Sequence, residues 1–185
     1  MDKQNLRKQY LSLRKQQPPK LLAAWSREIA AHLETVVEFQ QAQMVMTYLS
    51  AHGEVETLEL VRKLLVTGRN VCVPLCDVRT HTMTAHRIDR MEQLHPGSFG
   101  ILEPTEENTV SVGDIDFIVV PGCVFNRDKH RIGYGKGYYD KFLSLPKRRA
   151  VTAGLAYGFC LMDDFETDIY DVKLDMIVTE TGVLR

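Results

Sequence analysis

The sequence is organised around the stretch Arg131-Ile132-Gly133-Tyr134-Gly135-Lys136-Gly137-Tyr138-Tyr139-Asp140, which follows the apolar run Phe117-Ile118-Val119-Val120. The apolar run predicts a strand that ends at Pro121-Gly122, and we expect residues 121–137 to form a loop, not a strand. Alternating glycines let the backbone of this loop adopt positive φ angles and approach a ligand closely. We expect a helix from Gly137 to Leu143, with its N-terminus directed at an anion.

The residue types in this glycine loop favour a polyphosphate ligand. Consecutive backbone N–H groups in such a loop form a concave nest for anions. Arg131 and Lys136 add a planar and a mobile positive charge. Asp140 is able to hold a divalent cation that is shared with phosphate oxygens, as magnesium sites in nucleotide enzymes usually do. The alternative is an ordinary glycine-rich turn, but the charged residues and the Tyr-Tyr-Asp sequence beside the glycines favour phosphate binding.

The loop differs from two better-known phosphate motifs. It is not a Walker A motif, because Lys136 is followed by Gly137 and not by Ser or Thr. It is not the dinucleotide fingerprint either, because Tyr138 stands where that motif needs its third glycine.

The overall composition restricts the classes of protein that are possible. A chain of 185 residues is long enough for one domain, which we expect to span residues 1–185. The formal net charge of -1 argues against a dedicated nucleic-acid binder. The sequence has no apolar run of membrane-spanning length and no signal-peptide segment at its start, so we expect a cytoplasmic enzyme or binding protein without a membrane partner. The four cysteines show no zinc-site spacing, and we expect Cys123 to be structural and not a nucleophile.

Apolar strands alternate with helical segments along the chain. This alternation predicts βαβ units and a mainly parallel sheet that is covered on both faces. We expect helices over residues 2–17, from there to about Phe39, and up to about Thr67. We expect further strands at Met44–Leu49, Val71–Leu75, Met83–Ile88, Val151–Ala156 and Met176–Val178.

The first twenty residues carry six basic side chains against Asp2, a local charge of +5. Lys3, Arg7 and Arg14 share one face of the predicted first helix. A solvated basic surface and a contribution to an anion site both remain open for this face. A non-catalytic nucleic-acid binder would use the same charges, and its affinity would fall steeply with salt, but the net charge of -1 argues against it.

Two further segments of the sequence contain acidic residues. The segment Ser50–Thr57 follows the strand that begins at Met44, and loops after the carboxyl ends of parallel strands bind ligands in open α/β sheets. Glu54 lies in this segment, where it either contacts a ligand or begins the next helix. Near the C-terminus, we expect the patch formed by Asp163, Asp164, Glu166, Asp168 and Asp171 to be solvated.

The glycine loop, together with the preceding Pro121-Gly122-Cys123-Val124-Phe125, resembles the signature of the 5-formyltetrahydrofolate cyclo-ligase family, also called methenyltetrahydrofolate synthetases. The resemblance implies a Rossmann-like three-layer sandwich with helices on both faces of the sheet. It also implies a ligase that uses ATP and Mg2+ to convert 5-formyltetrahydrofolate, a reduced folate, into 5,10-methenyltetrahydrofolate. We expect such an enzyme to act as a monomer.

The resemblance also implies roles for individual residues. Arg131 and Lys136 would be catalytic, and Asp140 and Asp175 would hold the magnesium ion, the latter through the closing motif Asp171-Val172-Lys173-Leu174-Asp175-Met176-Ile177-Val178-Thr179. The reduced folate would contact Leu49, Glu54 and Tyr138. The nucleotide-binding set would be Lys3, Arg7, Arg131, Ile132, Gly133, Tyr134, Gly135, Lys136, Gly137, Tyr138 and Tyr139.

Three positions depart from the family pattern. Lys129 stands where the family has a turn glycine, Tyr170 stands where a histidine is frequent, and Asn126 stands where an aspartate is usual. Because a side chain at a turn-glycine position strains the backbone, the first departure affects the expected turn geometry. A sugar-phosphate isomerase or a CoA-transferase-like enzyme of similar architecture remains the alternative. Such an enzyme would use the loop for phosphate without consuming ATP.

Overall fold

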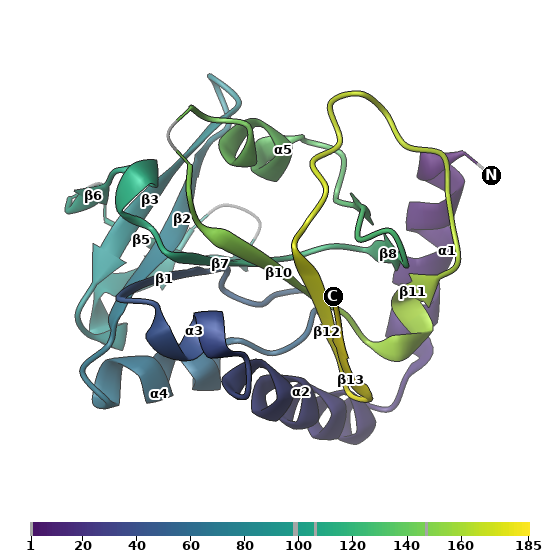
Figure 1. Ribbon diagram of the computed structural model, residues 1–185, viewed down its shortest axis with the longest axis horizontal. Helices are drawn as coiled ribbons and strands as arrows, with labels where there is room; N and C mark the ends of the chain where they lie inside the picture. Colours follow the sequence, from purple (N-terminus) through teal and green to yellow (C-terminus); the bar gives the residue numbers. More distant parts are fainter. Residues whose placement is uncertain (1, 98–99, 106, 147) are drawn as a thin grey trace.

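The apolar runs of the sequence form the centre of an eight-stranded sheet in the computed structural model, which describes residues 2–97, 100–105, 107–146 and 148–185 (Figure 1). The central strand β7 (Phe117–Val120) pairs in parallel with β1 (Met44–Thr47) on one side and with β10 (Val151–Leu155) on the other. All four residues of β7 are buried, as expected for a strand that is covered on both faces.

The sheet is parallel in its middle and antiparallel at its edges. Its strand order is β13-β12-β10-β7-β1-β2-β3-β6. β2 (Asn70–Asp77) runs parallel to β1, and β12 (Met176–Thr179) runs parallel to β10. The antiparallel edge strands are β13 (Gly182–Leu184), β3 (Thr82–Ile88) and β6 (Thr109–Val110).

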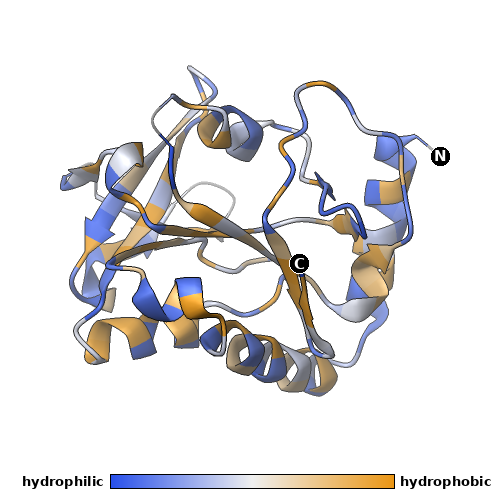
Figure 2. Ribbon diagram, viewed as in Figure 1, coloured by the Kyte–Doolittle hydropathy of each residue, from blue (hydrophilic) through white to orange (hydrophobic). Residues whose placement is uncertain are grey.

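Helices cover both faces of this sheet, as predicted. In Figure 1, α2 (Pro19–Glu34), α3 (Val37–Gln41) and α4 (Leu58–Val66) lie below it, and α5 (Tyr138–Leu143) lies above it. The apolar residues of Figure 2 are concentrated in the strands between these helices. Alternate side chains of β7 enter separate cores, so that Phe117 packs towards α2 and α4 while Ile118 packs towards α5.

The remaining elements are shorter. The helix α1 (Lys3–Gln16) lies at one end of the sheet beside the short strand β8 (Val124–Asn126) (Figure 1). The described residues also form a two-stranded ribbon and short 3-10 helices: β4 (Leu94–Pro96), β5 (Leu102–Pro104), η1 (Met91–Gln93), η3 (Val112–Asp114) and η4 (Gly158–Cys160). Within the ranges that the structure describes, no helix combines the length and the apolar character needed to cross a membrane.

The second predicted helix is interrupted before Phe39. α2 ends at Glu34, and α3 begins only at Val37. The Thr35 hydroxyl donates to the carbonyl of His32 at 2.7 Å, and Val36 adopts an extended backbone. A local side-chain hydrogen bond of this kind competes with the helical pattern and ends the helix.

The prediction that residues 121–137 contain no strand is wrong. β8 (Val124–Asn126) and β9 (Arg131–Ile132) form an antiparallel pair, and β11 (Leu161–Met162) joins β8 in parallel. The Phe125 ring fills a space that exists because Gly154 has no side chain. A Cβ atom at position 154 would lie 2.5 Å from this ring. The pairing therefore depends on a residue of a distant strand, which the local sequence does not reveal.

The strand order places a topological switch between β1 and β7. From β1 the chain passes through α4 to β2 on one side, and it later returns to β7 on the other side of β1. The segments that leave the carboxyl ends of these two neighbouring strands therefore diverge. Open α/β sheets bind ligands in the crevice that such a divergence creates.

Lys129 adopts the left-handed conformation that the family pattern assigns to glycine, with φ at 70°. Because a left-handed L-residue costs about 1 kcal/mol, Lys129→Gly should raise the free energy of unfolding by up to about that amount, measured by urea denaturation. The neighbouring Asp128 is not a positive-φ residue, so Asp128→Gly should give no gain. Equal effects of the two substitutions would contradict a strained turn.

Candidate active site

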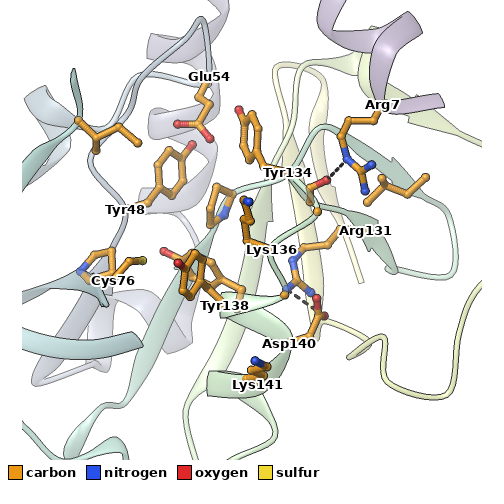
Figure 3. A pocket seen from close by; sticks show the side chains of 18 of the residues that line it. Arg7, Tyr48, Glu54, Cys76, Arg131, Tyr134, Lys136, Tyr138, Asp140 and Lys141 are labelled. Atoms are coloured by element: carbon orange, nitrogen blue, oxygen red, sulfur yellow. Dashed lines mark hydrogen bonds and ion pairs between the residues drawn. The ribbon is translucent and has the colours of Figure 1, made fainter. Parts of the chain in front are cut away.

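A cavity of about 830 Å³ opens where the segments after β1 and β7 diverge (Figure 3). It is lined by every residue in the predicted nucleotide-binding and substrate-binding sets. These residues are Lys3, Arg7, Leu49, Glu54, Arg131, Ile132, Gly133, Tyr134, Gly135, Lys136, Gly137, Tyr138 and Tyr139. Of the two predicted metal ligands, Asp140 lines the cavity and Asp175 does not.

The glycine loop has the backbone geometry that its sequence predicts. Gly135 and Gly137 have φ angles of 93° and 70°, and Gly137 directly precedes α5. Arg7 supports the loop from α1, because its Nε donates to the Gly133 carbonyl at 2.7 Å. A Cβ atom at position 135 would lie 3.3 Å from Arg7 Cζ, so the guanidinium lies close against the loop backbone.

The two cations of the loop have different environments. Lys136 is exposed, and in Figure 3 its side chain lies among the residues around the cavity. The Arg131 side chain is only 2% exposed and pairs with Asp140, with 3.0 Å between Nη2 and Oδ1. Burial lowers the pKa of the Arg131 guanidinium, and the charge of Asp140 opposes that shift. Arg131 is therefore held in place, whereas Lys136 is able to move towards a ligand.

A second carboxylate near Asp140 comes from the first aspartate of the closing motif. Asp171 lines the cavity and forms an ion pair with Lys3, and its Oδ2 accepts from the backbone N–H of Asp168 at 2.7 Å. Val172 donates its backbone N–H to Asp140 Oδ1 at 3.3 Å, which connects the segment of Asp171 to α5. The prediction that the whole C-terminal acidic patch is solvated is therefore wrong for Asp171, whose side chain is 17% exposed.

Asp175 has a different environment. Its Oδ2 accepts hydrogen bonds from the backbone N and the Oγ1 of Thr152, at 2.8 and 2.7 Å. It precedes β12 and so lies at the amino end of a parallel strand, whereas the cavity opens beyond the carboxyl ends. Asp171, and not Asp175, therefore lines the cavity together with Asp140, and the metal pairing of Asp140 with Asp175 stays a prediction.

Glu54 lies on a segment that is fixed by hydrogen bonds. The Tyr157 hydroxyl donates to the Glu54 carbonyl at 2.9 Å, and the Tyr48 hydroxyl donates to the Val55 carbonyl at 2.8 Å. Burial raises the pKa of the Glu54 carboxyl, and the Ala51 N–H that it accepts at 3.0 Å opposes this shift. α4 begins only at Leu58, so Glu54 does not start that helix.

No pattern in the sequence indicated the apolar wall of the cavity. This wall comes mainly from the end of β2 and from the segment that enters β5, and it includes Tyr48, Pro74, Cys76, Val78, Ile101 and Leu102. The cavity therefore has a cationic region at the glycine loop and an apolar, aromatic region beside Glu54 (Figure 3). One region suits an anion, and the other suits a flat ring with polar edges.

In the part of the chain that the structure describes, the site offers neither an activated cysteine nor a preformed metal cage. Cys123 is fully buried, and burial raises the pKa of its thiol to about 12, as expected for a structural cysteine. Among the residues that the structure describes, no group of three or more His, Cys, Asp or Glu side chains is arranged to hold a metal ion.

The match to known proteins covers nearly the whole chain. The model of the 5-formyltetrahydrofolate cyclo-ligase family matches residues 1–180. The chain belongs to this family. The resemblance seen in the sequence is thereby confirmed, and the family is one of ligases. A match of this length argues against the sugar-phosphate isomerase and CoA-transferase alternatives.

Individual relatives agree with this assignment. The probable 5-formyltetrahydrofolate cyclo-ligase of Schizosaccharomyces pombe is 29% identical over 181 residues, which cover 89% of this chain and 88% of the relative. The NMR structure of Aquifex aeolicus 5,10-methenyltetrahydrofolate synthetase is 32% identical, with a TM-score of 0.88 over 100% of this chain and 93% of that one. The synthetase from Mycoplasma pneumoniae is 26% identical, with a TM-score of 0.79 over 97% of this chain and 99% of its own. The expected Rossmann-like sandwich is confirmed.

Cys76 provides a chemical test of the cavity. It is half-buried in the apolar wall, while Cys72, Cys123 and Cys160 are buried. Iodoacetamide should therefore modify Cys76 first, as mass spectrometry of tryptic peptides would show. The reaction should be slow at pH 8 and accelerate at higher pH, because burial raises the pKa of this thiol to about 11. Faster modification of any of the other three cysteines in the folded protein would contradict the described cavity.

Proposed function

We propose that this protein catalyses the ATP-dependent cyclisation of 5-formyltetrahydrofolate to 5,10-methenyltetrahydrofolate, with release of ADP and phosphate. The observation that carries the proposal is the single cavity in which a cationic glycine loop faces an aromatic region with a carboxylate. A phosphate donor and a folate could bind there with their reacting groups together. Membership in a family named for this reaction supports the assignment.

The proposed chemistry requires positioning and not a protein nucleophile. The formyl oxygen is a poor leaving group, so the γ-phosphoryl group of ATP is transferred to it and ADP is released. N10 of the folate then attacks the formyl carbon, phosphate leaves with the former formyl oxygen, and N10 loses its proton. Phosphoryl transfer of this kind depends on alignment and on neutralisation of charge, which the cations of the loop would supply.

We assign different tasks to the two catalytic cations. Lys136, exposed beside the cavity, would follow the transferring phosphate as its charge is redistributed. The ion pair with Asp140 fixes Arg131, which would hold the transferring phosphate in position against the loop. Arg7 and Lys3 would contact other phosphate groups of the nucleotide, since both line the same cavity from α1.

The carboxylates of Asp140 and Asp171 fit a magnesium ion. Mg2+ is usually bound by one or two carboxylates together with water and phosphate oxygens. Both carboxylates line the cavity, and both are now paired with cations, Arg131 and Lys3. When bound, the ion would supply positive charge to the phosphate oxygens. Asp171 thus takes the role that the sequence resemblance gave to Asp175.

The folate would occupy the region beside Glu54. A reduced pterin has amino and ring N–H donors, which match a carboxylate acceptor. Leu49 and Tyr138 line the same cavity and would contact the faces of the ring. The raised pKa of Glu54 means that it becomes protonated more readily than an exposed carboxylate as the pH falls.

The reaction itself is the direct test. Wild-type protein mixed with 5-formyltetrahydrofolate and MgATP should produce the absorbance of the methenyl product, and omission of ATP should abolish it. Lys136→Ala should lower kcat by about 100-fold or more, because it removes a charge that acts on the transferring phosphate. Lys8→Ala provides the control, since Lys8 is exposed on α1 outside the cavity. Near-normal turnover by Lys136→Ala would remove Lys136 from the mechanism.

The two candidate metal ligands are separated by a pair of matched substitutions. Asp171→Asn should raise the Mg2+ concentration for half-maximal turnover by about tenfold or more. Asp175→Asn should leave that concentration unchanged and instead lower the melting temperature, because it weakens the hydrogen bonds from Thr152. The reverse pattern would restore Asp175 as the metal ligand.

A further inference from the structure

Arg14 of α1 is buried between the two segments that form the cavity. This residue is only 4% exposed, although its side chain is charged. Nη2 donates to the Gly122 carbonyl at 2.9 Å, and Nη1 donates to the Tyr134 hydroxyl at 3.1 Å. One guanidinium therefore connects the end of β7 to a side chain of the glycine loop.

The same arginine also packs against the segment that carries Glu54. A Cβ atom at Gly53 would lie 3.4 Å from Arg14 Cγ and Cδ, and Gly53 has a φ angle of 75°. The turn before Glu54 thus lies against the aliphatic part of Arg14. Lateral movement of Arg14 would disturb both the glycine loop and the turn that positions Glu54.

Tyr134 completes the connection. Its hydroxyl end faces the Glu54 carboxylate across the top of the cavity (Figure 3), and both side chains line that cavity. The hydroxyl can accept from Arg14 and donate to Glu54 at the same time. The backbone of Tyr134 lies between Gly133 and Gly135, in the part of the loop expected to bind phosphate.

Several groups act on the Glu54 charge. Burial raises the pKa of Glu54, whereas Tyr134 and the charges of Arg14 and His52 lower it. Tyr48, which directly follows β1, and Tyr139 from α5 line the same cavity and interact electrostatically with this carboxylate. Removal of the Tyr134 hydroxyl would therefore leave Glu54 less well stabilised in its charged form.

We propose that Tyr134 is a positioning residue that couples the two substrate sites, because its hydroxyl is held by Arg14 and faces Glu54 while its backbone belongs to the phosphate loop. A nucleotide that orders the loop also fixes the Tyr134 side chain, which in turn holds Glu54 towards the folate. Nucleotide and folate therefore favour each other's binding, and linkage makes this effect reciprocal. The inference rests on the proposed function and adds to it a communication between the two halves of the cavity.

The test measures binding of 5-formyltetrahydrofolate by calorimetry, with and without Mg2+ and a non-hydrolysable ATP analogue. In the wild type, the analogue should tighten folate binding at least about fivefold. Tyr134→Phe should weaken folate binding in the presence of the analogue by about tenfold, the effect of a hydrogen bond to a charged group. In this variant, the ratio of the folate affinities measured with and without the analogue should approach one. In turnover, KM for the folate should rise while kcat stays nearly unchanged.

Two further measurements separate positioning from a merely structural role. In a Glu54→Gln background, Tyr134→Phe should have little additional effect, because the two residues act as a unit. In the wild type, folate binding should weaken as the pH falls through the pKa of Glu54. Tyr134→Phe should move this loss to higher pH, since it removes a group that lowers that pKa. Tyr10→Phe, on the same helix as Arg14 but outside the cavity, is the control for loss of a tyrosine hydroxyl.

Each outcome has a definite meaning. If Tyr134→Phe retains the wild-type enhancement, or if its effect persists in full in the Glu54→Gln background, the coupling is overturned while the proposed function stands. If the wild type forms the methenyl product but shows no nucleotide enhancement, the coupling is likewise overturned. If the wild type neither binds 5-formyltetrahydrofolate nor forms the product, the proposed function fails and the coupling fails with it.

Discussion

The parallel pairing of β1 with β7 is the constraint on which the site depends. Both strands are covered on both faces, so their side chains are almost entirely apolar and cannot carry the chemistry. Polar and charged groups are therefore restricted to the segments beyond the strand ends. Because the chain departs from these two strands in opposite directions, one segment brings Glu54 and the other brings the glycine loop to the same cavity.

Charge pairing keeps this cavity compatible with a folded, unliganded protein. Lys3 pairs with Asp171, and the buried Arg131 pairs with Asp140. An unpaired buried charge would be costly, so these pairs compensate for the desolvation of Arg131 in particular. The same groups are the ones that we assign to phosphate and to magnesium. Ligand binding would therefore exchange partners among existing charges, without any need to bring new charges into the protein.

The sequence predicted the central sheet and the cationic part of the cavity lining, for two different reasons, but it did not predict the apolar wall. The strands β1, β7 and β10 are short continuous apolar runs, a pattern that is visible locally. The lining residues came largely from the motif of the glycine loop and from the family resemblance that it carries. The helix break at Thr35 and the pairing of β8 with β9 depend on hydrogen bonds and packing that no local sequence pattern predicts.

Two features of the site were not predicted from the sequence, for a physical reason. Asp171 and Asp175 belong to one motif, but the segment between them has no regular structure before β12, so spacing alone does not indicate which carboxylate faces the cavity. Arg14 stands on a basic helix face that resembled a solvated surface, yet its guanidinium is buried against Gly122 and Tyr134. Both cases depend on contacts between distant segments, which only the folded chain reveals.

The central claim is that the glycine loop beyond β7 binds the phosphates of a nucleotide. An NMR titration of 15N-labelled protein with Mg2+ and a non-hydrolysable ATP analogue tests it most directly. The account predicts that the backbone amide resonances of Gly133, Gly135 and Gly137 shift together and saturate with a single dissociation constant. Saturation of binding elsewhere, with these three resonances unmoved, would contradict it.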